Sequence, residues 1–280
     1  MNAPRELRLG LIPDMPAAEY HATQAMSAGG LKRMRQSPAH FYGMQLDPSR
    51  PISESTPAMK AGTLFHCALF EPQALAERYA VKPEGLSLST KDGKAWKEAL
   101  PAGIEVVDSA AMAKALKQAE RVLADPDLRA LLADGYGEAS ALWIDAETGE
   151  LCKCRPDWTN PAGDGVILVD GKSCPDASPA GFARTAWNMG YIHTAAWYID
   201  GFQAATGQPV HGYVFAAVEH DWPHIAKGWM VPDDVLDAAR RDNRRILNLY
   251  AECRRTNNWP GYSPGISLIT LPKWANLENA

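Results

Sequence analysis

Two strand-like stretches organise this chain, Leu151-Cys-Lys-Cys-Arg-Pro-Asp-Trp158 and Val166-Ile-Leu-Val-Asp-Gly-Lys-Ser173. The second begins as a run of Val, Ile and Leu and turns to charged residues at its end, where Asp170 and Lys172 stand two residues apart. Residues at that spacing on a strand point to the same face of the sheet. With Asp157 at the end of the first stretch, the pattern predicts a metal site beside a lysine, which suits a phosphate.

Runs of apolar and β-branched residues predict further strands. They are expected at residues 137–144, around Cys152 and Cys154, and at 166–169, 210–218 and 229–232. A turn at residues 145–150 joins the first two strands as a hairpin, and we expect the third to extend them into one antiparallel or mixed sheet. Glu138, Asp157 and Asp170 could then converge at one edge of that sheet.

Capping residues and apolar spacing predict the helices. They are expected at residues 27–36, between Pro57 and Pro72, at 109–133 with a break at Asp125-Pro126, and at 178–190, 191–206 and 233–255. Ser109 is the predicted N-cap of the third helix. The segments left over are an extended arm at 1–19, a loop at 47–57, a loop leading to a short helix within 80–108, and a tail at 256–280 that packs over the core.

The composition favours one soluble domain. Of the 280 residues, 46% are hydrophobic, which is enough for a substantial core, and we expect an arm over 1–20 and a single domain over 21–280. The sequence has no run of about 18 apolar residues and no signal-peptide pattern, so we expect no membrane contact and a cytoplasmic location. A net charge of −5 argues against nonspecific coating of nucleic acid but is compatible with a nuclease.

The five cysteines are scattered through the sequence rather than paired in CxxC motifs. This spacing favours reduced thiols. A zinc site built from Cys152, Cys154 and Cys174 is the less favoured alternative, because Cys-x-Cys on a strand lacks the tight turn of a zinc knuckle.

His66 lies in the apolar second predicted helix. A histidine in such surroundings is more often a core residue than a metal ligand, so the residues alone favour a core position. Gly62, one turn earlier, weakens a helix and suggests that something approaches closely there. The basic residues of the first helix fit either a solvated face or contacts to phosphate; they are Lys32, Arg33 and Arg35.

Hydrolysis of a phosphodiester requires charge stabilisation at the phosphate and an activated water. Carboxylates that hold one or two Mg²⁺ ions supply the first, and the metal with a nearby lysine supplies the second. Asp-x-Lys alone occurs by chance roughly once in a chain of this length. The buried strand before it and the acidic residues Asp157 and Glu138 on earlier strands add context. A metal-dependent nuclease therefore competes with surface salt bridging as the interpretation.

The sequence also resembles the RecE family, the exonuclease VIII type of recombination nuclease from phages and prophages, within the PD-(D/E)xK superfamily. The resemblance covers most of residues 19–207. It rests on Glu19-Tyr-His21, on residues 27–41 with Leu31-Lys32 and Ser37-Pro-Ala-His-Phe41, on Gly62-Thr-Leu-Phe-His-Cys-Ala-Leu-Phe-Glu-Pro72, on Gly149-Glu-Leu-Cys-Lys-Cys-Arg-Pro-Asp157, on Val169-Asp-Gly-Lys-Ser173 and on residues 191–207.

The resemblance implies a role for each matching residue of the metal site. His66, Asp157 and Asp170 would be metal ligands, which replaces the core interpretation of the histidine. The main-chain carbonyl of Gly171 would also reach the metal, and Lys172 would orient or activate the attacking water.

Other matches concern catalysis and DNA. Glu138 fits the acidic residue of the family's first strand. The family's Gln-x-x-x-Tyr signature appears as Thr194-Ala-Ala-Trp-Tyr198, which keeps the catalytic tyrosine and loses the glutamine. Threonine has a shorter reach, so substrate positioning is altered. The residues expected to contact DNA are Lys32, Arg33, Arg35, Arg155 and Thr194.

The implied fold is α/β (α+β), a central mixed β-sheet flanked by helices with a restriction-endonuclease-like core. The implied activity is a Mg²⁺-dependent exonuclease, with Mn²⁺ able to substitute, that degrades linear double-stranded DNA from the 5′ end and leaves 3′ single strands for recombination. Family members form rings, which implies a ring-shaped homo-oligomer and a single-strand annealing protein as partner. A structure-specific endonuclease and a DNA-binding or assembly module without turnover remain as alternatives.

Overall fold

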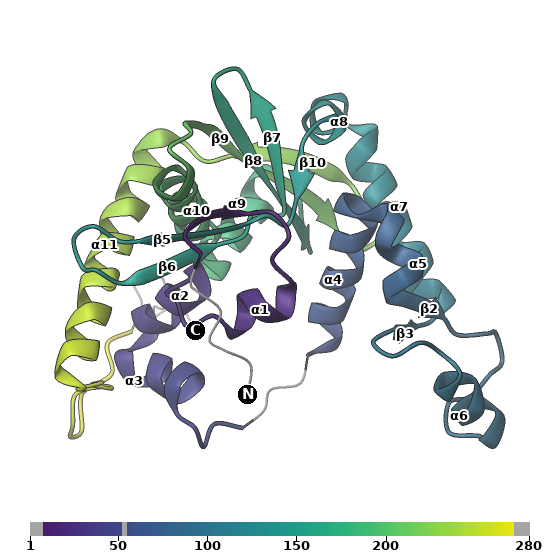
Figure 1. The fold of residues 1–280 in the computed structure, drawn as a ribbon, viewed down its shortest axis with the longest axis horizontal. Helices are drawn as coiled ribbons and strands as arrows, with labels where there is room; N and C mark the ends of the chain where they lie inside the picture. The colour runs from purple at the N-terminus through teal and green to yellow at the C-terminus, as the bar shows by residue number, and fades with distance from the viewer. Residues whose placement is uncertain (1–7, 52–54, 272–280) are drawn as a thin grey trace, which may run out of the picture.

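The computed structural model describes residues 8–51 and 55–271 (Figure 1). Its strands are β1 (Gly10–Ile12), β2 (Tyr79–Val81), β3 (Glu105–Val107), β4 (Tyr136–Gly137), β5 (Ser140–Ile144), β6 (Leu151–Cys154), β7 (Trp158–Ala162), β8 (Gly165–Cys174), β9 (Val210–Glu219) and β10 (Ala226–Met230). Its α-helices are α1 (Ala17–Ala22), α2 (Ala28–Gln36), α3 (Pro38–Phe41), α4 (Pro57–Phe70), α5 (Leu75–Arg78), α6 (Lys91–Glu98), α7 (Ser109–Ala124), α8 (Pro126–Ala133), α9 (Pro179–Met189), α10 (Tyr191–Thr206) and α11 (Asp233–Thr256). A π-helical turn covers Tyr42–Leu46 and a 3₁₀ turn covers Pro72–Ala74.

The main sheet has five strands in the order β10-β9-β8-β7-β4. β8 and β9 run parallel, and the other neighbours run antiparallel, so the sheet is mixed. The parallel connection from β8 to β9 passes through α9 and α10, as parallel pairing requires a long crossover. A mixed sheet flanked by helices confirms the predicted fold class.

Each face of the main sheet packs against a different set of helices (Figure 1). In β9, Val214, Ala216 and Val218 face a cluster built from α4, α7 and α8. The alternate residues Tyr213, Phe215 and Ala217 face a second cluster built from α9, α10 and the start of α11. This two-residue alternation explains why β9 is apolar throughout, since both of its faces are buried.

A second sheet has the order β1-β5-β6 and is antiparallel. It packs with α2, α10 and α11 around Trp143 and Trp197. Helix α10 lies very close to β5, because a Cβ on Gly201 would be 2.2 Å from the Trp143 ring. The indole nitrogen of Trp197 also donates to the Lys153 carbonyl at 3.1 Å. These contacts fix the hairpin that leads to Asp157 against α10, the second helix after β8.

The strand prediction needs three corrections. Residues 166–169 do not extend the β5–β6 hairpin; β8 instead pairs with β7, a strand that the sequence reading missed. Strand β8 continues to Cys174, so Asp170 and Lys172 lie within it and not at its end. Glu138 lies between β4 and β5 rather than on a strand, with a φ of 56°.

Four smaller expectations also differ. Asp108, and not Ser109, caps α7, since its side chain accepts from the Ala111 nitrogen at 2.7 Å. The expected loop at 80–108 contributes the short parallel pair β2–β3, and the expected arm at 1–19 contributes β1, while its residues 1–7 lie outside the described part. Gly62 has no neighbour within 4 Å of an added Cβ.

The tail contacts the core near its start. The Trp259 ring stacks on Phe41 with centroids 5.7 Å apart, whereas residues 260–271 are exposed and 272–280 are not described. Among the described helices, none has the length and apolar character needed to cross a bilayer.

Candidate metal and nuclease site

The candidate site lies where α4 meets the middle of β8. The backbone of Gly171 has to approach α4 closely, because a Cβ at this position would lie 2.8 Å from the Phe70 ring. Its carbonyl oxygen is 2.9 Å from His66 Nε2, and its nitrogen donates to Asp157 Oδ2 at 2.9 Å. The other ring nitrogen of His66 is 3.3 Å from the same carboxylate oxygen. Three residues from three separate segments therefore share one contact network.

Charge coupling accompanies this geometry. Burial disfavours the protonated imidazole, but the adjacent Asp157 carboxylate outweighs it, so the pKa of His66 is raised. Burial acts against the ionised form of Asp157 as well, yet His66 and Lys172 hold the pKa of that carboxyl well below its usual range. Asp157 is thus kept ionised and ready to accept a cation.

Glu138 joins the network from the bend between β4 and β5. Its nitrogen donates to the Asp157 carbonyl at 3.2 Å, which holds the bend beside the start of β7. Its carboxylate pairs with Arg155 at 2.7 Å. Burial, helped by the Asp157 charge, raises the pKa of Glu138, while Arg155 opposes the shift.

The residues fit a hard divalent cation. Ligand atoms of His66, Glu138 and Asp157 all lie within 4.8 Å of one another, and no other cluster of three or more His, Cys, Asp or Glu residues of this kind occurs in the described ranges. Two carboxylates with one imidazole are donors that Mg²⁺ or Mn²⁺ accepts. The main-chain oxygen of Gly171 faces the same histidine. On the chemistry of its donors, the cluster can hold such an ion.

Asp170 and Lys172 form the second half of the site. They point to one face of β8, as their spacing predicts, and the Lys172 Nζ is 2.6 Å from Asp170 Oδ2. Burial raises the pKa of Asp170 to about 7; Asp157 adds to this shift and Lys172 opposes it. Burial would lower the pKa of Lys172, but Asp170 and Asp157 together raise it. The lysine is therefore a charged group held between two acids.

Tyr191 is a site neighbour that the sequence reading missed. Its ring lies 5.1 Å from Lys172 Nζ, a cation–π distance. The only signal in the sequence is an aromatic residue directly after Gly190, where α10 begins. Lys172 also donates to the Gly171 carbonyl at 3.2 Å, which places it between the two halves of the site.

The signature residues of α10 make contacts inside the protein. The Thr194 hydroxyl donates to the Gly190 carbonyl at 3.2 Å, within the same helix. The Tyr198 ring packs edge-on against Tyr213, with centroids 6.2 Å apart. Burial raises the pKa of Tyr198 well above its ordinary value, so this phenol stays neutral.

The predicted DNA-contacting cations differ in their surroundings. Arg155 is 14% exposed and, besides Glu138, donates to the Met15 carbonyl at 3.0 Å. Arg35 pairs with Asp242 at 2.5 Å. Lys32 is exposed and donates to the Met189 carbonyl at 2.9 Å, and Arg33 is half-buried. Of this set, Lys32 is the most available to a phosphate.

All five cysteines are free thiols buried in the protein. Burial raises the pKa of Cys174 to about 11 and raises that of Cys152 and Cys154 still further. Among the described residues, no three of these sulfur atoms lie close enough together to hold a metal ion. The reduced-thiol prediction is therefore favoured over the zinc alternative.

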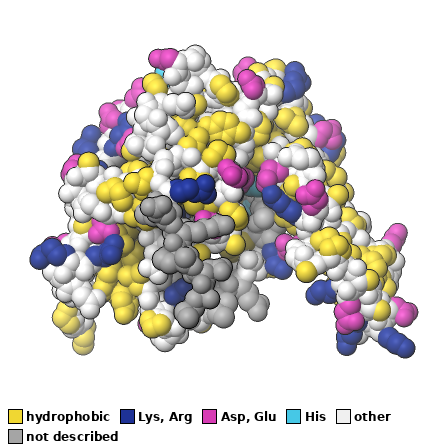
Figure 2. Space-filling view, in the orientation of Figure 1, with side chains coloured by type: hydrophobic (Ala, Val, Ile, Leu, Met, Phe, Trp, Pro, Cys, Tyr) yellow, Lys and Arg dark blue, Asp and Glu magenta, His cyan; other side chains and the backbone are white. Residues whose placement is uncertain are grey.

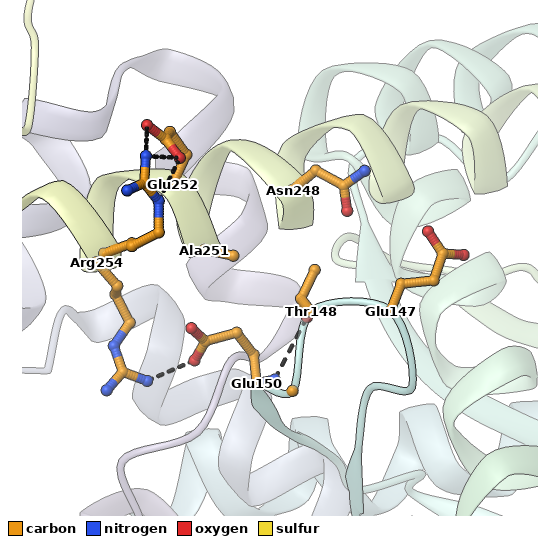
Figure 3. Close-up of a pocket in the computed structure, with 9 residues that line it drawn as sticks. Glu147, Thr148, Glu150, Asn248, Ala251, Glu252 and Arg254 are labelled. Carbon is orange, nitrogen blue, oxygen red and sulfur yellow. Dashed lines mark hydrogen bonds and ion pairs between the residues drawn. The ribbon is translucent and has the colours of Figure 1, made fainter.

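Charged groups of both signs gather near the middle of the face seen in Figure 2. A separate surface hollow, drawn in Figure 3, lies between the β5–β6 turn and α11 and is lined by residues such as Glu147 and Asn248. Its charges are already paired: Arg254 with Glu150, and Arg255 with Glu252 at 2.7 Å. The first pair attaches the hairpin to α11 and the second lies within α11, so the charges of the hollow have a structural explanation.

The chain is similar to known proteins in its family and in its fold. Residues 27–272 match the family model described as a PDDEXK-like domain of unknown function. The crystal structure of a "putative exonuclease" from Eubacterium rectale superposes with a TM-score of 0.59 at 16% identity, covering 91% of this chain and 96% of that one. The crystal structure of SSO0001 gives a TM-score of only 0.29 at 13% identity, covering 68% and 87%, and carries no argument. No curated protein matches the chain.

Proposed function

This chain belongs to the family of PDDEXK-like domains, and from that premise we propose that it is a Mg²⁺-dependent exonuclease that degrades linear double-stranded DNA. The family and the shared fold support a nuclease enzyme in general. The finer features of the proposal rest on the resemblance to RecE-type enzymes: 5′-to-3′ polarity, 3′ single-stranded products for recombination, a ring-shaped homo-oligomer and a single-strand annealing partner in a bacterial cytoplasm.

One observation carries the proposal: the middle of β8 presents an acid, a glycine and a lysine in sequence. His66 contacts the carbonyl oxygen of that glycine, and the Asp157 carboxylate accepts a hydrogen bond from its nitrogen. Distances of 2.6 to 3.3 Å join these groups. His66 and the Gly171 carbonyl that it contacts are 105 positions apart in the sequence. Surface salt bridging gives no reason for a lysine and two acids to be buried together.

The site residues divide the work of phosphodiester hydrolysis. A bound Mg²⁺ would supply charge stabilisation at the scissile phosphate and favour ionisation of water. His66, Glu138 and Asp157 are the residues proposed to hold it, with Asp170 and the Gly171 carbonyl beside them. Lys172 orients the attacking water through its ammonium donors, because Asp170 fixes its position from one side and Tyr191 from another. Tyr198 is proposed to orient substrate as a neutral hydrogen-bond donor.

Two alternative functions would give different results in the experiment described below. A structure-specific endonuclease would use the same residues on closed DNA. A DNA-binding or assembly module without turnover is favoured by Thr194, which stands where RecE-type enzymes have glutamine and whose hydroxyl is engaged with Gly190.

The test incubates linear and covalently closed duplex DNA with the protein and Mg²⁺, using wild type and Lys172→Ala. Lys227→Ala, an exposed lysine on β10, is the matched control. We expect loss of linear DNA only, abolished in Lys172→Ala and unchanged in Lys227→Ala. Equal cutting of closed circles would favour the endonuclease, and cutting of neither, with DNA still bound, would favour the binding module. Labels at the 5′ and 3′ ends report the polarity.

A further inference from the structure

The turn at Gly190 joins α9 to α10, and we call it and the last turn of α9 the elbow. The elbow carries a large exposed aromatic side chain. Trp187 is 71% exposed and Met189, two residues on, is 47% exposed. The other face of α9 is buried, with Phe182 and Ala186 in the core against β9. The exposure of Trp187 is therefore a property of its face of the helix, and this face has no partner among the described residues in the hydrophobic clusters.

This elbow adjoins the candidate nuclease site. Gly190, in the left-handed conformation, ends α9 and starts α10. The next residue, Tyr191, lies over Lys172 Nζ at 5.1 Å. Trp187, in the last turn of α9, is thus four residues before the first residue of α10, which contacts the proposed catalytic lysine.

The charge around the elbow suits a polyanion. Helix α9 contains no Asp or Glu, and Arg184 lies one turn before Trp187 on its exposed face. Lys32 reaches across from α2 and donates to the Met189 carbonyl at 2.9 Å, which brings a second cation to the elbow. An aromatic ring with cations beside it is the arrangement that binds single-stranded nucleic acid, where bases stack and phosphates pair with the cations.

We propose that Trp187 stacks on an unpaired nucleobase of the DNA strand whose phosphate is presented to Lys172. The inference rests on the proposed nuclease function and specifies how that site holds its substrate strand. A base that stacks on Trp187 must be out of its duplex, so the preferred ligand has a frayed or single-stranded end. Every base offers a flat face, so the contact is tolerant of sequence.

The experiment measures binding and cleavage separately. Fluorescence anisotropy in chelator, where no metal supports cutting, gives the affinity for labelled duplex DNA with a short single-stranded end. Trp187→Ala should weaken binding about 5- to 150-fold, the range for one stacked base, and Trp187→Phe should restore most of it. The matched control is Trp222→Ala, which removes an equally exposed tryptophan (72%) that lies over Arg121 instead.

A second binding measurement tests whether the contact is base stacking. The same DNA with abasic sites in the single-stranded end should bind wild type as weakly as intact DNA binds Trp187→Ala, and the two changes together should cost no more than either alone. Equal affinity of wild type and Trp187→Ala for intact DNA, while linear DNA is still digested, would overturn this inference and leave the nuclease proposal standing. Absence of any DNA binding by wild type would overturn both. A change in oligomer size for Trp187→Ala without a change in DNA affinity would assign the ring to a protein interface and overturn the stacking role.

Discussion

The backbone nitrogen of Gly171 donates a 2.9 Å hydrogen bond to Asp157 Oδ2, so the glycine of β8 orients the carboxylate that immediately precedes β7. At the same residue β8 lies tight against α4, since a Cβ on Gly171 would be 2.8 Å from the Phe70 ring. Gly171 therefore has two roles: its missing side chain permits the packing, and its nitrogen orients the carboxylate of the site.

Gly171→Ala is expected to lower the free energy of unfolding by about 1–3 kcal/mol, because the added methyl overpacks a buried aromatic ring. Urea denaturation measures the change. Gly62→Ala in α4 is the control: an added Cβ meets nothing within 4 Å there, and alanine is the better helix former by about 1 kcal/mol. Equal stability of Gly171→Ala and wild type would show that Phe70 moves aside without cost.

Removal of the imidazole at His66 is expected to weaken Mn²⁺ binding by at least about tenfold, since loss of even an outer-sphere partner has an effect of that size. Calorimetric titration with Mn²⁺ of wild type and His66→Ala measures it without relying on activity. His211→Ala is the control, because that histidine is exposed and pairs with Asp164 at 2.8 Å, outside the cluster. Unchanged affinity in His66→Ala would remove the histidine from the proposed ligand set.

Arg155 is expected to act on the position of Glu138 more than on DNA. Arg155→Ala should lower the free energy of unfolding by about 1–3 kcal/mol, because it leaves a half-buried carboxylate and the Met15 carbonyl without their donor. It should leave the salt dependence of DNA binding unchanged, whereas Lys32→Ala, at an exposed cation, should reduce the slope by about one. A reduced slope for Arg155→Ala would restore its predicted role as a phosphate contact.

The ion pair between the buried Asp145 and the partly exposed Arg244 predicts a pH effect on stability. Two bonds of 2.7 and 2.8 Å join them, and the bonds from Arg244 and Thr148 lower the pKa of Asp145 to about 2 even though burial opposes this. Because the folded-state pKa lies below the unfolded value of about 4, the stabilisation is complete above pH 4 and is lost as the pH falls toward 2.

Asp145→Asn should therefore be less stable than wild type by a constant amount between pH 5 and 8, about 1–3 kcal/mol, with the difference shrinking below about pH 4. Urea titrations at several pH values measure it. Asp164→Asn, whose carboxylate is largely exposed, should show a much smaller difference. A gap that persists undiminished toward pH 2 would contradict the assigned ion pair.

Local patterns in the sequence were enough to predict many of the helices and strands. The apolar run before Asp170 predicted a buried strand, and the two-residue period predicted that Asp170 and Lys172 share a face, as their 2.6 Å contact confirms. Helices over most of the predicted ranges follow from capping and apolar spacing, which act within a few residues. The boundary errors at Ser109 and at β8 arose where a neighbouring residue caps better or where the sheet continues through charged residues.

The sequence alone determined which residues could do chemistry on β8, because side-chain direction along a strand is a local property of the backbone. Only the tertiary structure decided what meets them. His66 reaches Gly171 across 105 residues, Glu138 arrives from a bend between two sheets, and Tyr191 lies on Lys172 through the crossover helix. No local period encodes these meetings, since they depend on which helix packs on which face of the sheet, and that choice is made by the two apolar clusters as a whole.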